Sequence, residues 1–180
     1  IIMDEVYISL TNKTTTYKTA LKQNYDKIII VSSFSKYWAV PGWRVGWVLS
    51  NPDIISQIVK LQSNILTCAP NSSQEVCYNL LDTNFTPDLT ILKESSQELS
   101  KIFIDNGWSL PPNNELSMYL FPVNNNINIR KLVDDLLENG LGVICGEPFG
   151  YKNAIRLTLP NNYDDLEDIK KILIKVLPNK

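Results

Sequence analysis

Short apolar runs alternate with amphipathic segments along this chain, which is the pattern of a mixed α/β protein. In the first half, apolar residues cluster at 1–3, 28–31 and 46–49, and these runs predict short strands, the second of them over residues 27–33. Residues 8–26 are polar and rich in threonine, and they are long enough to form a crossover between two parallel strands. The first half therefore predicts part of an open α/β sheet.

Two helix-start signals follow the third apolar run. Asn51-Pro52-Asp53 combines a capping residue, a proline at the first helical position and an acid in the first turn. Farther on, Ser72 and Glu75 have the spacing of a capping box, which predicts a second helix to about Asp82. Residues 83–87 are polar and end in proline, so we expect a domain boundary there.

Residues 88–180 predict a separate α+β domain. The expected elements are helices at about 88–106, 129–139 and 164–177 and strands at 116–121, 141–145 and 154–159. In the last strand Ile155 and Leu157 alternate with Arg156 and Thr158. Because side chains alternate between the two faces of a strand, Arg156 is expected to point away from the apolar face.

The candidate chemistry lies just after the second apolar run, in Ser33-Phe34-Ser35-Lys36, with Arg44 eight residues beyond the lysine. Hydroxyls and an arginine fork match phosphate oxygens. A lysine held beside a bound phosphate ester can form an imine with an aldehyde on the same ligand. Pyridoxal 5′-phosphate (PLP) carries both groups. Ligands bind beyond the carboxyl ends of strands in such sheets, so Asp4 and Tyr7 are expected at the same edge.

This segment resembles the PLP-lysine signature of class I/II (fold-type I) aminotransferases, in which S-x-S-K is followed eight residues later by arginine. The wording SKYWAVPGWRVGW is most similar to the tyrosine (aromatic) aminotransferase branch. The resemblance implies an α/β fold, the C-terminal part of a fold-type I PLP-dependent transferase. Residues 1–87 would be the end of the PLP-binding large domain, and residues 88–180 the small C-terminal domain.

The resemblance also implies roles for the residues around the lysine. Lys36 would hold PLP as a Schiff base and then carry the proton between substrate and cofactor carbons. Ser33, Ser35 and Arg44 would bind the phosphate. The motif D-E-x-Y upstream matches the family's partners of the pyridine ring, with Asp4 on the ring nitrogen and Tyr7 on the phenolic oxygen.

Farther along, Ala-Ile-Arg156-Leu-Thr-Leu-Pro resembles the family's segment whose arginine binds the substrate α-carboxylate. The preceding residues 146–150, Gly-Glu-Pro-Phe-Gly, resemble its P-G-x-x-F-G loop with the proline and glycine displaced. Only Arg44, Arg130 and Arg156 are arginines, and none lies at 68–73, where enzymes for dicarboxylates often have one. This favours aromatic or broad apolar amino acids as donors, with 2-oxoglutarate as acceptor, and we expect Arg130 to be solvated.

Composition excludes several other kinds of site. The 180 residues contain no histidine, which excludes Ser-His-Asp and Cys-His catalysis and any histidine-ligated metal. The 3 cysteines show no C-x-x-C spacing, so we expect no metal site and no disulfide framework, and a reducing cytoplasm fits best. The net charge is −2, and the lysines and arginines are scattered along the chain, so nucleic acid is not expected as a partner. No apolar run approaches membrane-spanning length, so a membrane is not expected either.

The chain opens on Ile1-Ile2-Met3, apolar strand material with no cap before it. We therefore expect a C-terminal fragment of a longer protein, which by itself binds PLP poorly and is inactive. The complete protein is expected to be a homodimer, as family members usually are.

Alternatives remain open on these residues. PLP-dependent C–S β-lyases and related cyclopropane-forming synthases share the Asp, Tyr, Lys and Arg set, although the P-G-W-R-V-G-W wording favours an aminotransferase. A non-catalytic aminotransferase-like regulatory domain would retain the lysine behind a DNA-binding module. An ordinary structural or interaction domain would require every coincidence to arise by chance.

Overall fold

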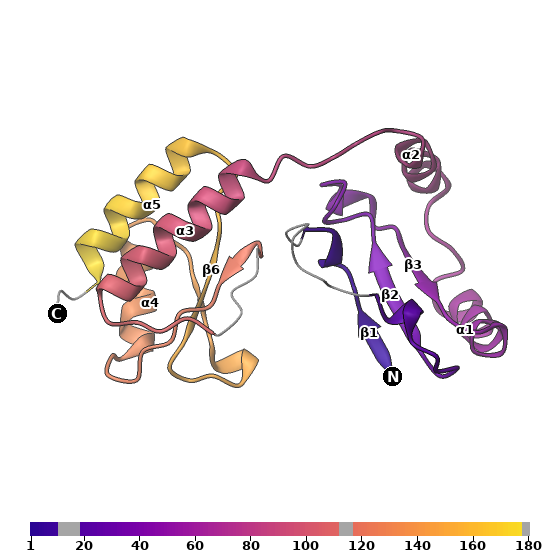
Figure 1. Ribbon diagram of the computed structural model, residues 1–180, viewed down its shortest axis with the longest axis horizontal. Helices are drawn as coiled ribbons and strands as arrows, with labels where there is room; N and C mark the ends of the chain where they lie inside the picture. Colours follow the sequence, from indigo (N-terminus) through magenta and orange to yellow (C-terminus); the bar gives the residue numbers. More distant parts are fainter. Residues whose placement is uncertain (11–18, 112–116, 178–180) are drawn as a thin grey trace. The chain divides into compact units, whose positions relative to one another are not determined.

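The computed structural model describes residues 1–10, 19–111 and 117–177 (Figure 1). These residues form two compact units, Ile1–Pro87 and Asp88–Lys180. We describe each unit by itself.

The first unit is built on a three-stranded sheet in the order β1-β2-β3. Its strands are β1 (Ile2–Asp4), β2 (Ile29–Ser33) and β3 (Gly46–Leu49), with short 3₁₀ turns η1 (Ile8–Leu10), η2 (Ala20–Lys22) and η3 (Pro41–Trp43). Strands β1 and β2 run parallel, with Asp4 opposite Val31, whereas β2 and β3 are antiparallel. The predicted strands and their parallel crossover are confirmed, although β2 starts at Ile29 and residues 11–18 of the crossover lie outside the described residues.

The backbones of β2 and β3 approach closely where β2 ends and β3 begins. Ser33 lies opposite Gly46, and a Cβ on Gly46 would be 2.7 Å from the backbone oxygen of Ser32. A side chain at this position would collide with backbone, which moves less readily than the end of a flexible side chain. Glycine therefore allows β3 to begin beside the end of β2.

Two helices follow, α1 (Pro52–Ile65) and α2 (Asn71–Leu81). The predicted start of α1 is confirmed, because the side chain of Asn51 accepts a hydrogen bond from the Ile54 N–H at 2.9 Å. The predicted capping box of α2 is wrong. That helix begins directly after Pro70, so Ser72 already has helical backbone and cannot be the capping residue.

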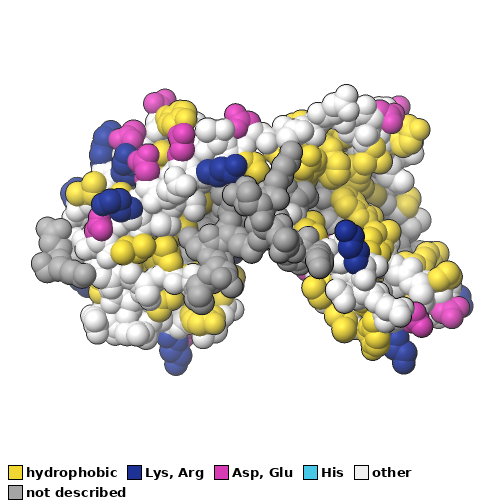
Figure 2. All heavy atoms as spheres, in the orientation of Figure 1, with side chains coloured by type: hydrophobic (Ala, Val, Ile, Leu, Met, Phe, Trp, Pro, Cys, Tyr) yellow, Lys and Arg dark blue, Asp and Glu magenta, His cyan; other side chains and the backbone are white. Residues whose placement is uncertain are grey.

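The buried core of the first unit is small. Its buried apolar side chains are Leu10, Ala20, Ile28, Ile30, Phe34 and Cys77, and helix α1 has no buried residue. On the face seen in Figure 2, hydrophobic side chains gather on the surface of this unit. The exposed apolar residues of its helices include Val59, Leu61, Ile65, Tyr78 and Leu81.

The second unit packs three helices against a small antiparallel sheet in the order β4-β6-β5. Its elements are α3 (Thr90–Asp105), β4 (Tyr119–Leu120), α4 (Ile129–Glu138), β5 (Ile144–Cys145), the turn η4 (Glu147–Phe149), β6 (Ile155–Thr158) and α5 (Tyr163–Val176). All three predicted helices are present, and the strands are shorter than expected; residue 116 of the first strand lies outside the described residues.

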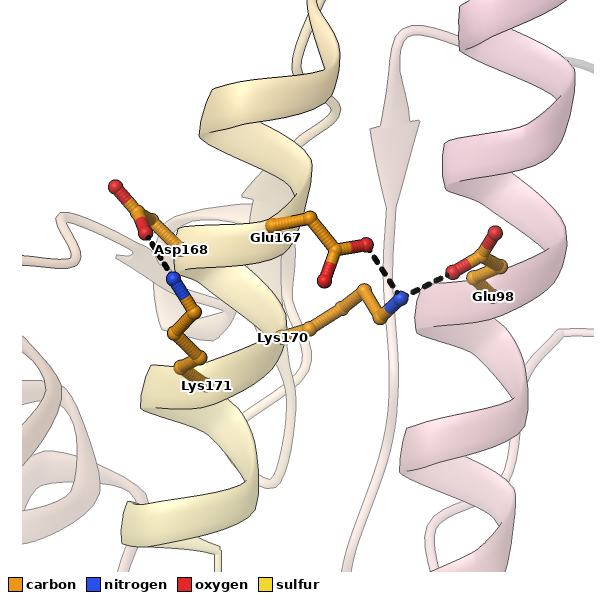
Figure 3. A network of polar contacts seen from close by, with 5 residues as sticks. All are labelled: Glu98, Glu167, Asp168, Lys170 and Lys171. Carbon is orange, nitrogen blue, oxygen red and sulfur yellow. Dashed lines mark hydrogen bonds and ion pairs between the residues drawn. The ribbon is translucent and has the colours of Figure 1, made fainter.

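The second unit has a continuous hydrophobic core. Leu99, Phe103, Leu136 and Leu173 are fully buried there, and Phe103 meets Trp108 edge to face at 5.5 Å between ring centres. Helices α3 and α5 are also joined on their outer side by Lys170. Its Nζ lies 2.7 Å from Glu98 Oε2 on α3 and 2.7 Å from Glu167 Oε1 on α5 (Figure 3).

Arg156 lies on β6 between the buried residues Ile155 and Leu157, and it is itself only partly exposed. The predicted alternation of this strand is therefore confirmed. Within the described ranges, no helix is both long enough and apolar enough to span a membrane.

Candidate active site

The candidate lysine lies three residues beyond β2, next to the aromatic ring that follows β1. The Nζ of Lys36 is 5.5 Å from the centre of the Tyr7 ring, a cation–π distance. Because β1 and β2 are parallel neighbours, the segments after both strands emerge at one edge of the sheet. The structure thus brings together two of the residues that the sequence predicted to share a site.

Asp4 is the last residue of β1 and lies opposite Val31 of β2. Its Oδ1 accepts a hydrogen bond from the Val6 N–H at 3.1 Å, and the residue is exposed. This bond occupies one oxygen in a local turn. The other oxygen, Oδ2, has no hydrogen bond to the described residues, so it is available to accept one at this edge of the sheet.

The two predicted phosphate serines form a compact turn at the end of β2. The Ser35 N–H donates a hydrogen bond to Ser33 Oγ at 3.3 Å, and both residues are half-buried. Ser33 also lies beside Gly46, where the backbone leaves no room for a side chain. Two hydroxyls are therefore concentrated at one place, which suits a phosphate group.

Arg44 is not brought to these serines. It is exposed, has a left-handed backbone with φ of 56°, and its Nη1 donates to the Pro41 carbonyl at 3.0 Å. Over residues 19–111, no hydrogen bond connects its guanidinium with Ser33 or Ser35. Its role as a phosphate ligand stays a prediction that requires the side chain to turn.

Aromatic side chains support the segment around Lys36. Phe34 is buried, with its ring centre 4.7 Å from Trp38 and 5.1 Å from Trp47 of β3. Tyr37 donates a hydrogen bond to the Phe85 carbonyl at 3.2 Å. The residues on either side of Lys36 are thus anchored by rings, which leaves the lysine at the surface of a fixed segment.

Glu5 was missed by the sequence analysis. It is only 6% exposed, and its carboxylate accepts hydrogen bonds from the Ala20 N–H at 2.8 Å and from Thr19 Oγ1 at 2.8 Å. A buried carboxylate is tolerated only with such donors. The acidic residue directly after a strand was the available signal. By tying the end of β1 to η2, Glu5 orients the neighbours Asp4 and Tyr7.

In the second unit, Arg156 is flanked by aromatic rings. Its Cζ lies 4.7 Å from the centre of the Tyr119 ring and 4.9 Å from that of Phe149. Its Nε is buried and has no hydrogen-bond partner among the described residues. A guanidinium whose Nε is buried and that forms no ion pair with the described carboxylates is suited to bind an anion, because an unpaired buried donor is costly.

Arg130 was expected to be solvated, and it is highly exposed, but it is not unpaired. Its Nη2 lies 2.8 Å from Glu147 Oε2, in the turn that leads to Phe149. Hydrogen bonding and the charge of Arg130 lower the pKa of Glu147 below the ordinary carboxyl value. The sequence offered no signal for this pair, because the two residues belong to separate elements.

Comparison with known proteins identifies the family. The family model described as Aminotransferase class I and II matches residues 1–170. The chain belongs to the class I and II aminotransferases. The predicted fold class, the C-terminal part of a fold-type I transferase, is confirmed by solved structures of this family. This chain covers 46% of one of these solved chains and 50% of another.

Relatives with different substrates are similar to this aminotransferase chain. A (5-formylfuran-3-yl)methyl phosphate transaminase from Methanocaldococcus jannaschii is 33% identical over 97% of this chain and 50% of its own length. A solved protein from Methanococcus jannaschii, described as similar in its active site to kynurenine aminotransferases, is 31% identical over 96% of this chain and 50% of that one, with a TM-score of 0.77. Aspartate aminotransferase from Thermotoga maritima shares the fold, with a TM-score of 0.81 at 23% identity over 98% of this chain and 46% of that one. The chain thus spans about half the length of these relatives.

PLP is the cofactor of this family, and the residues of the first unit fit it. An amine lies against an aromatic ring, a carboxylate ends the adjacent strand, and two hydroxyls form one turn. These groups suit, in that order, the aldehyde, the ring nitrogen and the phosphate of PLP. The cofactor acts as an electron sink for the bonds at the substrate α-carbon.

Proposed function

We propose that the whole protein is a PLP-dependent aminotransferase that moves the amino group of an L-amino acid to a 2-oxo acid. The observation that carries the proposal is the approach of Lys36 Nζ to the Tyr7 ring, at the edge where Asp4 and Ser33 end the two parallel strands. Family membership supports it, since the match extends over residues 1–170.

Each residue has a role in the proposed reaction. Lys36 would hold the cofactor through its aldehyde, and its Nζ would be the base for the proton at the substrate α-carbon. Asp4 keeps the ring nitrogen protonated, and Tyr7 donates a hydrogen bond to the phenolic oxygen. Ser33, Ser35 and Arg44 bind the phosphate.

Arg156 binds the substrate α-carboxylate in this proposal. Its Nε is buried and has no hydrogen-bond partner in the part of the chain that the structure describes, which supports the role, because an arginine fork holds both oxygens of a carboxylate and so orients the α-carbon.

The donor is proposed to be an aromatic amino acid, or one of a broad range, with 2-oxoglutarate as acceptor. Of the three arginines, Arg130 is paired with Glu147, which leaves no arginine for a second substrate carboxylate from this chain. The relative from Methanocaldococcus jannaschii is named for (5-formylfuran-3-yl)methyl phosphate, so this aldehyde phosphate is a second acceptor to test. The three free cysteines suit a reducing cytoplasm, and we expect a homodimer by analogy with the family.

The test uses the whole protein loaded with PLP. Tyrosine is added without any oxo acid while the visible absorbance of the loaded protein is recorded. Loss of that absorbance, reversed by 2-oxoglutarate or by (5-formylfuran-3-yl)methyl phosphate, supports transamination and identifies the acceptor. A transient change with release of ammonia would instead indicate a lyase. A protein that takes up no PLP would favour a non-catalytic regulatory domain and contradict the proposal; the 180-residue chain alone is expected to remain inactive.

A further inference from the structure

The turn η4, which carries Phe149, is held at both ends by its backbone. The Gly146 N–H donates to the Ala154 carbonyl at 2.7 Å, and a Cβ on Gly146 would lie 2.4 Å from the Tyr151 carbonyl oxygen. Gly150 ends the turn with φ of 84°, a conformation that favours glycine. The backbone of the turn is therefore closely packed, whereas the Phe149 ring is 44% exposed and is not held by burial.

An ion pair connects this turn to a helix. Glu147, the first residue of η4, meets Arg130 in the first turn of α4, with 2.8 Å between Oε2 and Nη2. The neighbours of Arg130 on that helix, Ile129 and Leu132, are each 4% exposed and belong to the hydrophobic core. The helix end is thus a firm support for the turn.

Phe149 connects the turn to the arginine. Its ring centre lies 4.9 Å from the Cζ of Arg156 and 5.9 Å from the ring centre of Phe121, which it meets edge to face. A ring over a guanidinium attracts it and excludes water from one side. Displacing Phe149 would therefore change both the direction and the solvation of Arg156.

We propose that the Arg130–Glu147 ion pair is a positioning device that keeps Phe149 against Arg156 and so sets the affinity of the protein for its substrate carboxylate. This inference rests on the proposed role of Arg156. Exposed ion pairs add little to global stability. Removing this pair should therefore leave the protein folded, so that its effect on substrate binding can be measured.

Glu147→Gln is the informative variant, because glutamine has the same shape and can still accept a hydrogen bond. In the whole PLP-loaded protein we expect KM for the amino acid to increase about twofold to fivefold, the range of an exposed ion pair. The value of kcat should stay unchanged, because the carboxylate is bound equally in the ground state and the transition state. The double variant Arg130→Glu/Glu147→Arg restores the pair with its charges exchanged, and it should return KM toward the original value.

Two controls separate positioning from general destabilisation. Asp168→Asn removes the Lys171–Asp168 ion pair on α5, whose side chains are similarly exposed, and should leave KM unchanged. Competitive inhibition adds a chemical control. Glu147→Gln should weaken inhibition by 3-phenylpropionate, which has a carboxylate, and leave inhibition by 2-phenylethylamine, which has none, as it was.

Arg156→Gln distinguishes the positioning role of the ion pair from the proposed carboxylate-binding role of Arg156. If Arg156→Gln weakens 3-phenylpropionate and Glu147→Gln does not, the positioning role is overturned while the carboxylate site stands. If neither variant affects 3-phenylpropionate, the proposed role of Arg156 fails, and the positioning role fails with it. An equal effect of Asp168→Asn would also overturn the positioning role.

Discussion

The Nζ of Lys36 lies 5.5 Å from the centre of the Tyr7 ring, although each residue follows a different strand. The parallel pairing of β1 with β2, in which Asp4 lies opposite Val31, brings these two segments to one edge. The relationship connects an amine that can attach a cofactor with a ring that carries a hydroxyl.

Lys36→Ala should abolish transamination by the whole protein. The variant removes both the covalent attachment and the proton carrier, and the loss of an acid–base group alone costs about 10²- to 10⁴-fold in rate. Folding should be preserved, because the Lys36 side chain makes no hydrogen bond with the described residues, and the bond from the Ala39 N–H to the Lys36 carbonyl, at 3.3 Å, is a backbone bond that alanine keeps. Turnover and circular dichroism are measured together; a folded variant that retained turnover would contradict the assignment.

Tyr7→Phe should keep the ring beside Lys36 and remove only the hydroxyl. If that hydroxyl donates one hydrogen bond to the cofactor, removing the bond costs about 1 kcal/mol of transition-state stabilisation. This cost predicts a reduction in kcat/KM of about fivefold. Tyr25→Phe is the matched control, since Tyr25 is an exposed tyrosine of the same unit. Equal kinetics in both variants would remove Tyr7 from the site.

Arg156→Gln should raise KM for the amino donor by about 10- to 100-fold, because a hydrogen bond to a charged group contributes about 1.5–3 kcal/mol. Steady-state kinetics with tyrosine provide the measurement. Arg130→Gln, which removes another arginine of the same unit, should have a much smaller effect. If the two variants gave the same KM, the carboxylate site would have to lie elsewhere.

Leu136→Ala should destabilise the second unit by about 2–5 kcal/mol, the usual cost of a cavity in a packed core. Leu136 is 0% exposed, and its neighbour Leu137 on the same helix is 63% exposed. Leu137→Ala should therefore change stability by no more than about 0.5 kcal/mol. Denaturant unfolding of both variants compares the two positions, and similar losses would mean that the packing of α4 is misassigned.

The link between α3 and α5 should weaken at high pH. Hydrogen bonds from Lys170 to Glu167 and Glu98 raise the pKa of Lys170 above the ordinary lysine value. A raised folded-state pKa stabilises the fold below the unfolded-state pKa, about 10.4, and this contribution is lost as the pH rises through the folded-state value.

The difference in Tm between the original protein and Lys170→Met should therefore be constant near neutral pH and become smaller at strongly alkaline pH. Lys93→Met, at an exposed lysine on α3, serves as the control. A difference that did not change with pH would show that the Lys170 contribution is packing of its hydrocarbon chain and not charge.

Local rules made much of this protein predictable from its sequence. Asn51 and Pro52 start α1 because a capping side chain and a fixed φ act within one turn, and the alternation around Arg156 follows from the two-residue period of a strand. The Ser33–Lys36 segment with Arg44 resembles the PLP-lysine signature of the family, and the family model that matches residues 1–170 confirms this resemblance.

Only the tertiary structure decided which side chains meet across elements. The burial of Glu5 by Thr19 and Ala20 depends on how the crossover returns to β1, and the pairing of Arg130 with Glu147 depends on where η4 lies against α4. Such contacts are set by packing between segments distant in sequence, and no local pattern in the chain names the partner of either residue. The sequence therefore determined the candidate chemistry and the resemblance to the family, whereas packing determined which rings flank Arg156 and that Arg130 pairs with Glu147.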